Sequence, residues 1–311
     1  MVRTRQDDPV IEWLLAGDPA IRWQVMRDLL DEPAETWEAE RRQAVESGWI
    51  AELLERRGTD GEWPPGRWTA STWTLLLLVA CGIPEGHPAG RAPVERLLDR
   101  FMPPGDEVEQ AFLLKRVDLC HLGFWVGLGA HFLGDDPRLA PLGAAVLSAQ
   151  FDDGGWNCHM RNHPQTQHSS FHTTFNVLEN VRIAAERGAV PKRAFRAAEA
   201  RAVELMLAHR LYLSDRTGEV ISERFTQLTY PWHWHYAVLR GLDYIRLTPA
   251  ISDQRLSDAI DLLQERRKPN GRWPLQKRIP GTLLVEMEKP GQDSRWNTLR
   301  ALRVLRRRAG G

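Results

Sequence analysis

The stretch Gln150-Phe151-Asp152-Asp153-Gly154-Gly155-Trp156 decides the fold, because shorter copies of it occur twice elsewhere in the chain. The copies are Asp60-Gly61-Glu62-Trp63 and Asn270-Gly271-Arg272-Trp273. Asp-Gly and Asn-Gly pairs favour tight turns, so each copy predicts a turn that is followed by a tryptophan. The chain has 13 Trp among 311 residues, and their regular placement indicates an internal repeat.

Mostly apolar helices recur along the chain, with expected starts near residues 21, 71, 119, 171, 234 and 295. Between them, amphipathic helices are expected over residues 34–55, 92–101, 139–150, 192–209 and 253–267. An apolar helix that alternates with an amphipathic one is what two concentric layers require. We therefore expect an all-α protein, a closed (α/α)6 toroid in one domain over residues 1–311, whose inner helices line a central cavity. An open superhelical stack of the same hairpins is the alternative.

Charge and composition exclude several classes of protein. The 41 Lys and Arg balance the 41 Asp and Glu, so no net charge attracts nucleic acid or an anionic membrane. No apolar run reaches the ~18 residues of a transmembrane segment, and the N-terminal residues lack the apolar core of a signal peptide. Three cysteines fit a reducing cytoplasm better than a disulfide framework. The basic run Arg303–Arg308 is interpreted as the solvated end of a last helix.

The Gln-x-x-x-Gly-x-Trp turn formed by Gln150, Gly154 and Trp156 resembles the repeat of squalene and terpenoid cyclases and of protein prenyltransferase β subunits. By the order of its repeats, the resemblance covers nearly the whole chain. It implies the α/α toroid. A partner subunit or a homo-oligomer is a further expectation for this chain.

Two segments resemble the prenyltransferases more specifically. Asp118-Leu119-Cys120, shortly before Phe124, is similar to the segment whose Asp-x-Cys pair binds zinc, and Phe171-His172-Thr173 is similar to the helix that supplies the third ligand. The resemblance therefore implies Asp118, Cys120 and His172 as zinc ligands.

The residues themselves also point to a metal. Residues 118–172 hold two of the three cysteines and six of the ten histidines, and these are side chains that zinc prefers. Cys158 is the candidate for a further ligand, and His121 for an alternative ligand or an acid/base. A lanthionine-cyclase-like site that uses Cys120 with His121, or Cys158 with His159, is another interpretation.

The remaining candidates are expected to face the central cavity. The candidate catalytic residues are His121, His235 and Tyr236. Lys115 matches a lysine that contacts the prenyl diphosphate in the resembling family, and Arg116 beside it would favour an anionic leaving group. Aromatic faces would hold an apolar or cationic intermediate. The remaining substrate-binding candidates are Trp73, Phe124, Phe175, Arg240 and Trp296.

The function that these patterns favour is that of a zinc-dependent, cytoplasmic enzyme, a transferase, lyase or isomerase that resembles prenyltransferases and terpenoid cyclases. Its substrate would be an isoprenoid or another small apolar molecule. The alternative is a non-catalytic toroid that binds a ligand or peptide and uses its metal structurally; a closed set of four ligands would favour it. A carbohydrate-active ring would need paired carboxylates, for which Glu286 and Glu288 are the candidates.

Overall fold

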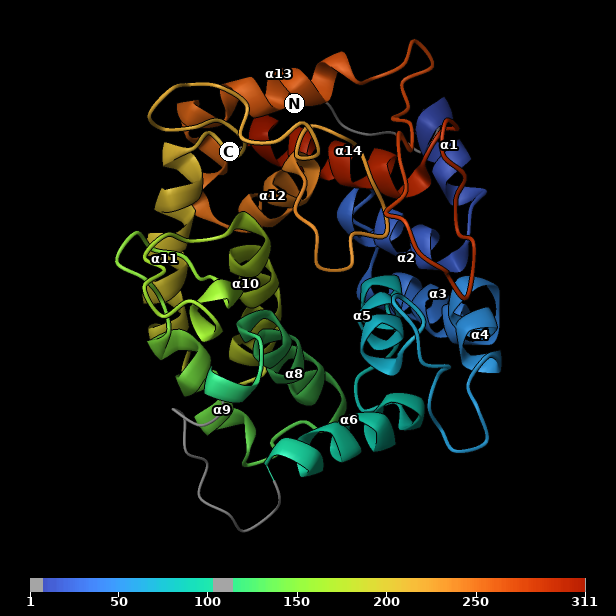
Figure 1. Ribbon diagram of the computed structural model, residues 1–311. Coiled ribbons are helices and arrows are strands. Elements are labelled where there is room, and N and C mark those ends of the chain that lie inside the picture. The colour runs from blue at the N-terminus through green and yellow to red at the C-terminus, as the bar shows by residue number, and fades with distance from the viewer. Residues whose placement is uncertain (1–7, 103–113, 311) are drawn as a thin grey trace. The chain divides into compact units, whose positions relative to one another are not determined.

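The computed structural model describes residues 8–102 and 114–310. Helices make up 57% of the structure, and the described residues form no β-strand, which confirms the all-α class (Figure 1). In these two ranges, no helix combines the length and the apolar character needed to cross a membrane. The chain divides into two compact units. The first unit comprises Met1–Arg57, Trp63–Pro84 and Leu207–Gly311, and the second comprises Gly58–Glu62 and Glu85–Met206. The single domain and the closed ring stay predictions.

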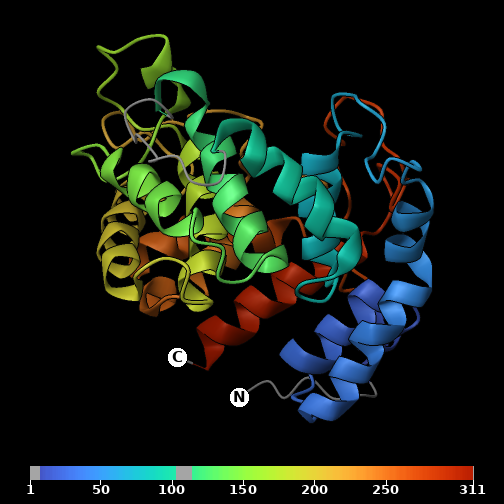
Figure 2. The ribbon, with the colours of Figure 1, turned by 90° about the horizontal axis from the view of Figure 1, so that it is seen from below.

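The first unit contains helices from both ends of the chain. Asp8 and Asp18 begin the first two helices by accepting hydrogen bonds from the amides of Val10 and Ala20, both at 2.8 Å. Helix α14 packs against α2 and α12 (Figure 2). The helices are α1 (Pro9–Leu15), α2 (Pro19–Asp28), α3 (Ala34–Glu46), α4 (Gly48–Glu55), α5 (Ser71–Cys81), α12 (Val238–Ile245), the 3-10 helices η2 (Pro249–Ser252) and η3 (Gln254–Leu256), α13 (Ser257–Glu265) and α14 (Arg295–Ala309).

The second unit is built around α8 and α10, which pack against each other (Figure 1). Their backbones come close because Gly127 has no side chain: a Cβ there would lie 2.6 Å from the Oδ1 of Asn180. Phe124, Phe132 and Phe175 are fully buried in this core. The elements are α6 (Pro88–Phe101), α8 (Leu119–Phe132), α9 (Leu139–Ser148), the 3-10 helix η1 (Cys158–Arg161), α10 (Phe171–Glu186) and α11 (Lys192–Ala208).

The repeated turn has the same structure at all three places. In each copy the glycine that follows the Asp or Asn has a positive φ, and the tryptophan is at most 3% exposed. Each indole N–H donates to a carbonyl ten residues earlier, from Trp63 to Leu53 (2.6 Å), Trp156 to Val146 (2.8 Å) and Trp273 to Leu263 (2.6 Å). These carbonyls lie in the last turns of α4, α9 and α13, where a helix leaves its carbonyls without internal partners. The tryptophan thus caps the preceding helix.

Each turn is also tied to the helix that follows it. The backbone amides of Trp63, Trp156 and Trp273 donate to the side-chain hydroxyls of Ser71 (3.1 Å), Thr174 (3.0 Å) and Thr298 (3.0 Å). These hydroxyls belong to α5, α10 and α14. One tryptophan therefore joins the end of an amphipathic helix to the start of the next apolar one, three times over.

Five of the six expected apolar helices begin at or within about two residues of the predicted position, as α2, α5, α8, α10 and α14. The fifth prediction, a start near residue 234, is wrong, because α12 begins only at Val238. Pro231 cannot donate a backbone hydrogen bond, and His233 has a φ of 50°, so a right-handed helix cannot pass through this segment. The helix expected over residues 34–55 is split into α3 and α4 at Gly48, whose φ is 73°.

Candidate functional site

Two cysteines from different elements meet in the second unit. Cys120 lies in the first turn of α8 and Cys158 begins η1, and both are half-buried. The backbone N–H of Cys120 donates to the Sγ of Cys158 at 3.1 Å. The Cys158 amide donates to the hydroxyl of Thr173 on α10 at 3.2 Å. The packing of α8 on α10 therefore brings together two thiols that are 38 residues apart. We call them the thiol pair.

The two thiols have opposite pKa shifts. Hydrogen bonds to its sulfur, first of all from the Cys120 thiol and then from Thr173, lower the pKa of Cys158 to about 7. The same hydrogen bond to Cys158, together with burial, raises the pKa of Cys120. At neutral pH Cys120 therefore keeps its proton, while about half of the Cys158 side chains are ionised.

The other predicted ligands stand at the starts of neighbouring helices. Asp118 is the N-cap residue of α8, and its Oδ1 forms an ion pair with the Nε of Arg161 at 3.2 Å. Its charge raises the pKa of both thiols, so it lies within electrostatic range of the thiol pair. His172 is half-buried in the first turn of α10, next to Thr173.

No group of three or more His, Cys, Asp or Glu side chains within residues 8–102 and 114–310 is arranged to hold a metal ion. Of the four predicted ligands, the structure joins Cys120 and Cys158 by a hydrogen bond and gives Asp118 an arginine partner. His121 is half-buried, and burial lowers its pKa, which favours the neutral imidazole.

The predicted substrate-binding residues of the second unit differ in exposure. Lys115 and Arg116 are exposed and helical, a few residues before α8, and the Arg116 carbonyl accepts a hydrogen bond from Arg161 at 3.0 Å. Phe124 and Phe175 are 0% exposed. Protein atoms therefore cover both aromatic rings, which act as packing residues in this structure.

The other candidates belong to the first unit. The hydroxyl of Tyr236 donates to the Leu211 carbonyl at 2.8 Å, which is a structural hydrogen bond. The Nη1 of the buried Arg240 donates to the His235 carbonyl at 2.8 Å, and burial lowers the pKa of His235 to about 4. Trp73 is half-buried against the edge of Trp68, and Trp296 is fully buried in a stack with Trp49 and Tyr230.

Glu286 and Glu288 do not form a pair of acid and base in this structure. Glu286 is exposed and pairs with Arg278 at 2.9 Å. Glu288 is half-buried and accepts hydrogen bonds from the Ser294 hydroxyl and from the amides of Arg295 and Trp296, so it stabilises the start of α14.

His233 lies in the run Tyr230–Tyr236, which is dense in aromatic and histidine side chains, but it was not among the predicted site residues. Its ring stacks on Trp68, with centroids 4.1 Å apart and an interplanar angle of 4°. Its φ of 50° is uncommon outside glycine, and such strain concentrates at functional sites. Burial lowers its pKa to about 3, so the ring is neutral. No residue pattern in this run predicts the left-handed backbone of His233.

The interpretation of Arg303 as a solvated residue is wrong. Arg303 is 5% exposed and forms an ion pair with Asp28. Arg300 is also buried, at 7% exposure. The spacing in the sequence could have indicated this burial. On a helix, residues three or four apart lie on the same face, so Arg300 and Arg303 share the face of the buried Trp296.

Comparison of the chain with protein-family models, with curated proteins and with solved structures found no match. A functional proposal therefore rests on the geometry of the sites. Two adjacent thiols, one of them with a lowered pKa, can bind a soft or borderline metal ion, or they can exchange with a disulfide.

Proposed function

We propose that the chain is a zinc-dependent enzyme, built as a closed toroid, whose metal is held at the thiol pair. The observation that supports this proposal is the 3.1 Å hydrogen bond from the backbone N–H of Cys120 to the Sγ of Cys158, which holds two cysteines of separate elements side by side. Zinc favours thiolate and imidazole ligands and takes about four of them. His172 and Asp118, at the starts of α10 and α8, would complete the set. Asp118 would then exchange Arg161 for the metal.

In this proposal the surrounding residues bind and orient an isoprenoid or another apolar substrate. A bound zinc ion would supply a Lewis acid that activates a thiolate or a water. Lys115 and Arg116 are exposed and would attract an anionic leaving group. The neutral imidazole of His121 would accept a proton next to the metal. A cytoplasmic location would keep the thiols reduced.

Elemental analysis of the purified chain, after zinc is offered and excess is removed, tests this proposal. We expect about one zinc per chain, retention that falls as pH drops below about 7 because binding requires the thiolate, and strong loss in Cys120→Ser and Cys158→Ser. Cys81→Ala, at a buried cysteine of the first unit, is the matched control and should keep the metal. Folded wild-type protein with far less than one equivalent would remove the zinc proposal, as would equal retention in both serine variants.

A second function is favoured by the opposite pKa shifts of the thiol pair, which are typical of a redox dithiol. The Cys158 thiolate would attack a substrate disulfide and release one substrate thiol. The Cys120 thiol would then displace the second, leaving a Cys120–Cys158 disulfide and two reduced substrate thiols. Mass spectrometry after treatment with oxidised glutathione separates the two functions: a dithiol centre loses about two hydrogens in the wild type and keeps a glutathione adduct in Cys120→Ser.

A further inference from the structure

A second polar site lies in the first unit around Arg300, on the face of α14 that also carries Trp296 and Arg303. Arg300, Trp232 and Trp296 are 7%, 8% and 0% exposed. Within the described residues, the Nε and Nη1 of Arg300 and the indole nitrogens of both tryptophans have no hydrogen-bond partner. Buried donors without an acceptor are rare in folded proteins, and each needs an explanation.

Aromatic rings form the walls of this site. The guanidinium carbon of Arg300 lies 3.9 Å from the ring centroid of Trp232, 4.8 Å from that of Tyr230 and 5.1 Å from that of Trp296. Ring faces attract the cation and keep water away, but they do not satisfy its N–H groups as an oxygen would. We call Arg300 and these three rings the Arg300 box. It holds a desolvated positive charge with unused donors.

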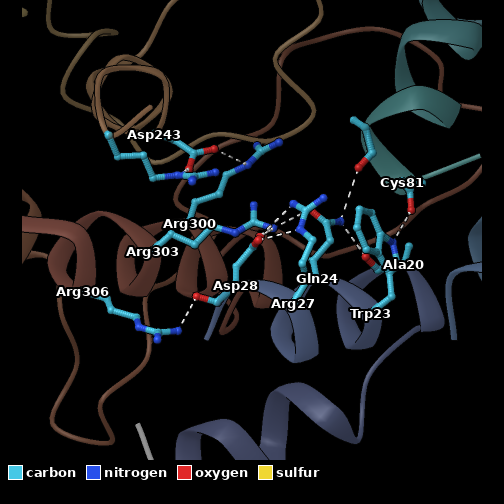
Figure 3. A network of polar contacts seen from close by, with 12 residues as sticks. Ala20, Trp23, Gln24, Arg27, Asp28, Cys81, Asp243, Arg300, Arg303 and Arg306 are labelled. Atoms are coloured by element: carbon cyan, nitrogen blue, oxygen red, sulfur yellow. Dashed lines mark hydrogen bonds and ion pairs between the residues drawn. The ribbon is translucent and has the colours of Figure 1, made fainter. Parts of the chain in front are cut away.

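In the ion-pair network that includes Arg300, arginines outnumber carboxylates. Ion pairs link Asp28 to Arg27 and Arg303, and Asp243 to Arg246 and Arg300 (Figure 3). Among the described residues of this network, four guanidinium groups therefore share two carboxylates. The contact of Arg300 is long, since its Nε lies 3.5 Å from the Oδ2 of Asp243. Burial lowers the pKa of Arg303 to about 10, the direction expected for a cation that is poorly compensated.

We infer that the Arg300 box binds a small oxyanion, a phosphate or a carboxylate group. Such a group accepts hydrogen bonds from guanidinium and indole N–H donors and offsets the surplus positive charge. The close approach of the three rings restricts the ligand to a small group.

Isothermal titration of the full chain in a chloride-free buffer, once with inorganic phosphate and once with acetate, tests this inference. We expect saturable binding of one anion per chain. The anion with the higher affinity shows whether the site recognises a phosphate or a carboxylate group. Trp232→Phe keeps the aromatic wall but removes the N–H donor, so affinity should fall about fivefold. Arg300→Lys removes the guanidinium, and affinity should fall about tenfold or more.

Trp234→Phe is the matched control, because Trp234 is half-buried in the same segment but is not part of the Arg300 box. It should bind like the wild type. Circular dichroism establishes whether each variant is folded. If Arg300→Lys does not fold, the anion affinity of Trp232→Phe still tests the inference. The inference is overturned if the folded wild type binds neither anion saturably, or if Trp232→Phe binds with unchanged affinity.

Discussion

Replacing Trp156 by Phe tests whether the repeated turn holds the helices together through its indole N–H. Trp156 is 0% exposed, and its N–H donates to Val146 in the last turn of α9. Phe keeps an apolar ring but loses this hydrogen bond and leaves the carbonyl buried, which costs about 1–3 kcal/mol. The smaller ring adds about 1 kcal/mol through imperfect filling. We therefore expect the free energy of unfolding to fall by about 2–4 kcal/mol, and by about 4 kcal/mol or more for Trp156→Ala.

Urea unfolding followed by far-ultraviolet circular dichroism and by fluorescence measures this loss. Both probes are needed, because a chain with two compact units can unfold in two steps. Trp37→Phe is the control, since Trp37 is half-buried on α3 outside the repeated turns, and a loss below about 1 kcal/mol is expected there. A Trp156→Phe protein within about 0.5 kcal/mol of the wild type, or a loss equal to that of the control, would refute the capping role.

Two further measurements follow from the backbone and from burial. Gly154→Ala should destabilise by about 3 kcal/mol or more, because φ is 100° and a Cβ would lie 2.5 Å from the Arg201 carbonyl oxygen; Gly188→Ala, at φ 84° in open space, should lose only about 1 kcal/mol, and equal losses would contradict the clash. The folded pKa values of His233 and His235, about 3 and about 4, lie below the usual value near 6.5. These two imidazoles therefore bind protons more tightly in the unfolded chain than in the folded one. Their effect on the free energy of unfolding is absent above about pH 6.5. Below that pH the free energy of unfolding falls toward pH 4, by at most about 1.4 kcal/mol per pH unit for each imidazole. His233→Asn, which tolerates a positive φ, should flatten this slope in urea titrations between pH 7 and 5, and an unchanged slope would exclude His233 as its source.

The helices and turns could be predicted because their causes are local. Apolar periodicity placed α8 and α10 at residues 119 and 171, and the Asp-Gly and Asn-Gly pairs placed the turns. The late start of α12 could not be predicted, since it depends on the positive φ of His233. The burial of Arg303 could not be read from local charge either, because its partner Asp28 comes from the other end of the sequence.

The candidate site was only partly accessible to sequence reasoning. Cys158 was a reasonable further ligand because cysteines are few, but its place beside Cys120 results from the packing of α8 on α10. Trp296 was among the predicted substrate-binding residues, but the rest of the Arg300 box, with Arg300 at its centre, was not predicted. Its walls, Tyr230 and Trp232, precede α12, while Arg300 is on α14, and nothing within either segment indicates that they meet.

The thiol pair is a local variation on a repeated scaffold. The three turns share their tryptophan cap and hydroxyl contact, but two residues after the tryptophan stand Pro65, Cys158 and Leu275, so only the middle copy carries a thiol. Because sulfur chemistry adds nothing to the shared contacts, Cys158→Ser should keep the free energy of unfolding within about 1 kcal/mol of the wild type while zinc retention or disulfide formation is lost.

Comparing the unfolding free energies of Cys158→Ser and Trp156→Phe shows whether the Cys158 thiol has a structural or a chemical role. Trp156 is two residues away and supports the same turn, so its replacement should lower stability. If Cys158→Ser instead unfolds the chain as readily as Trp156→Phe, the thiol contributes to the packing between η1 and α8, and its proximity to Cys120 reflects structure rather than chemistry. If only Trp156→Phe is destabilised, scaffold and chemistry are separable within one turn.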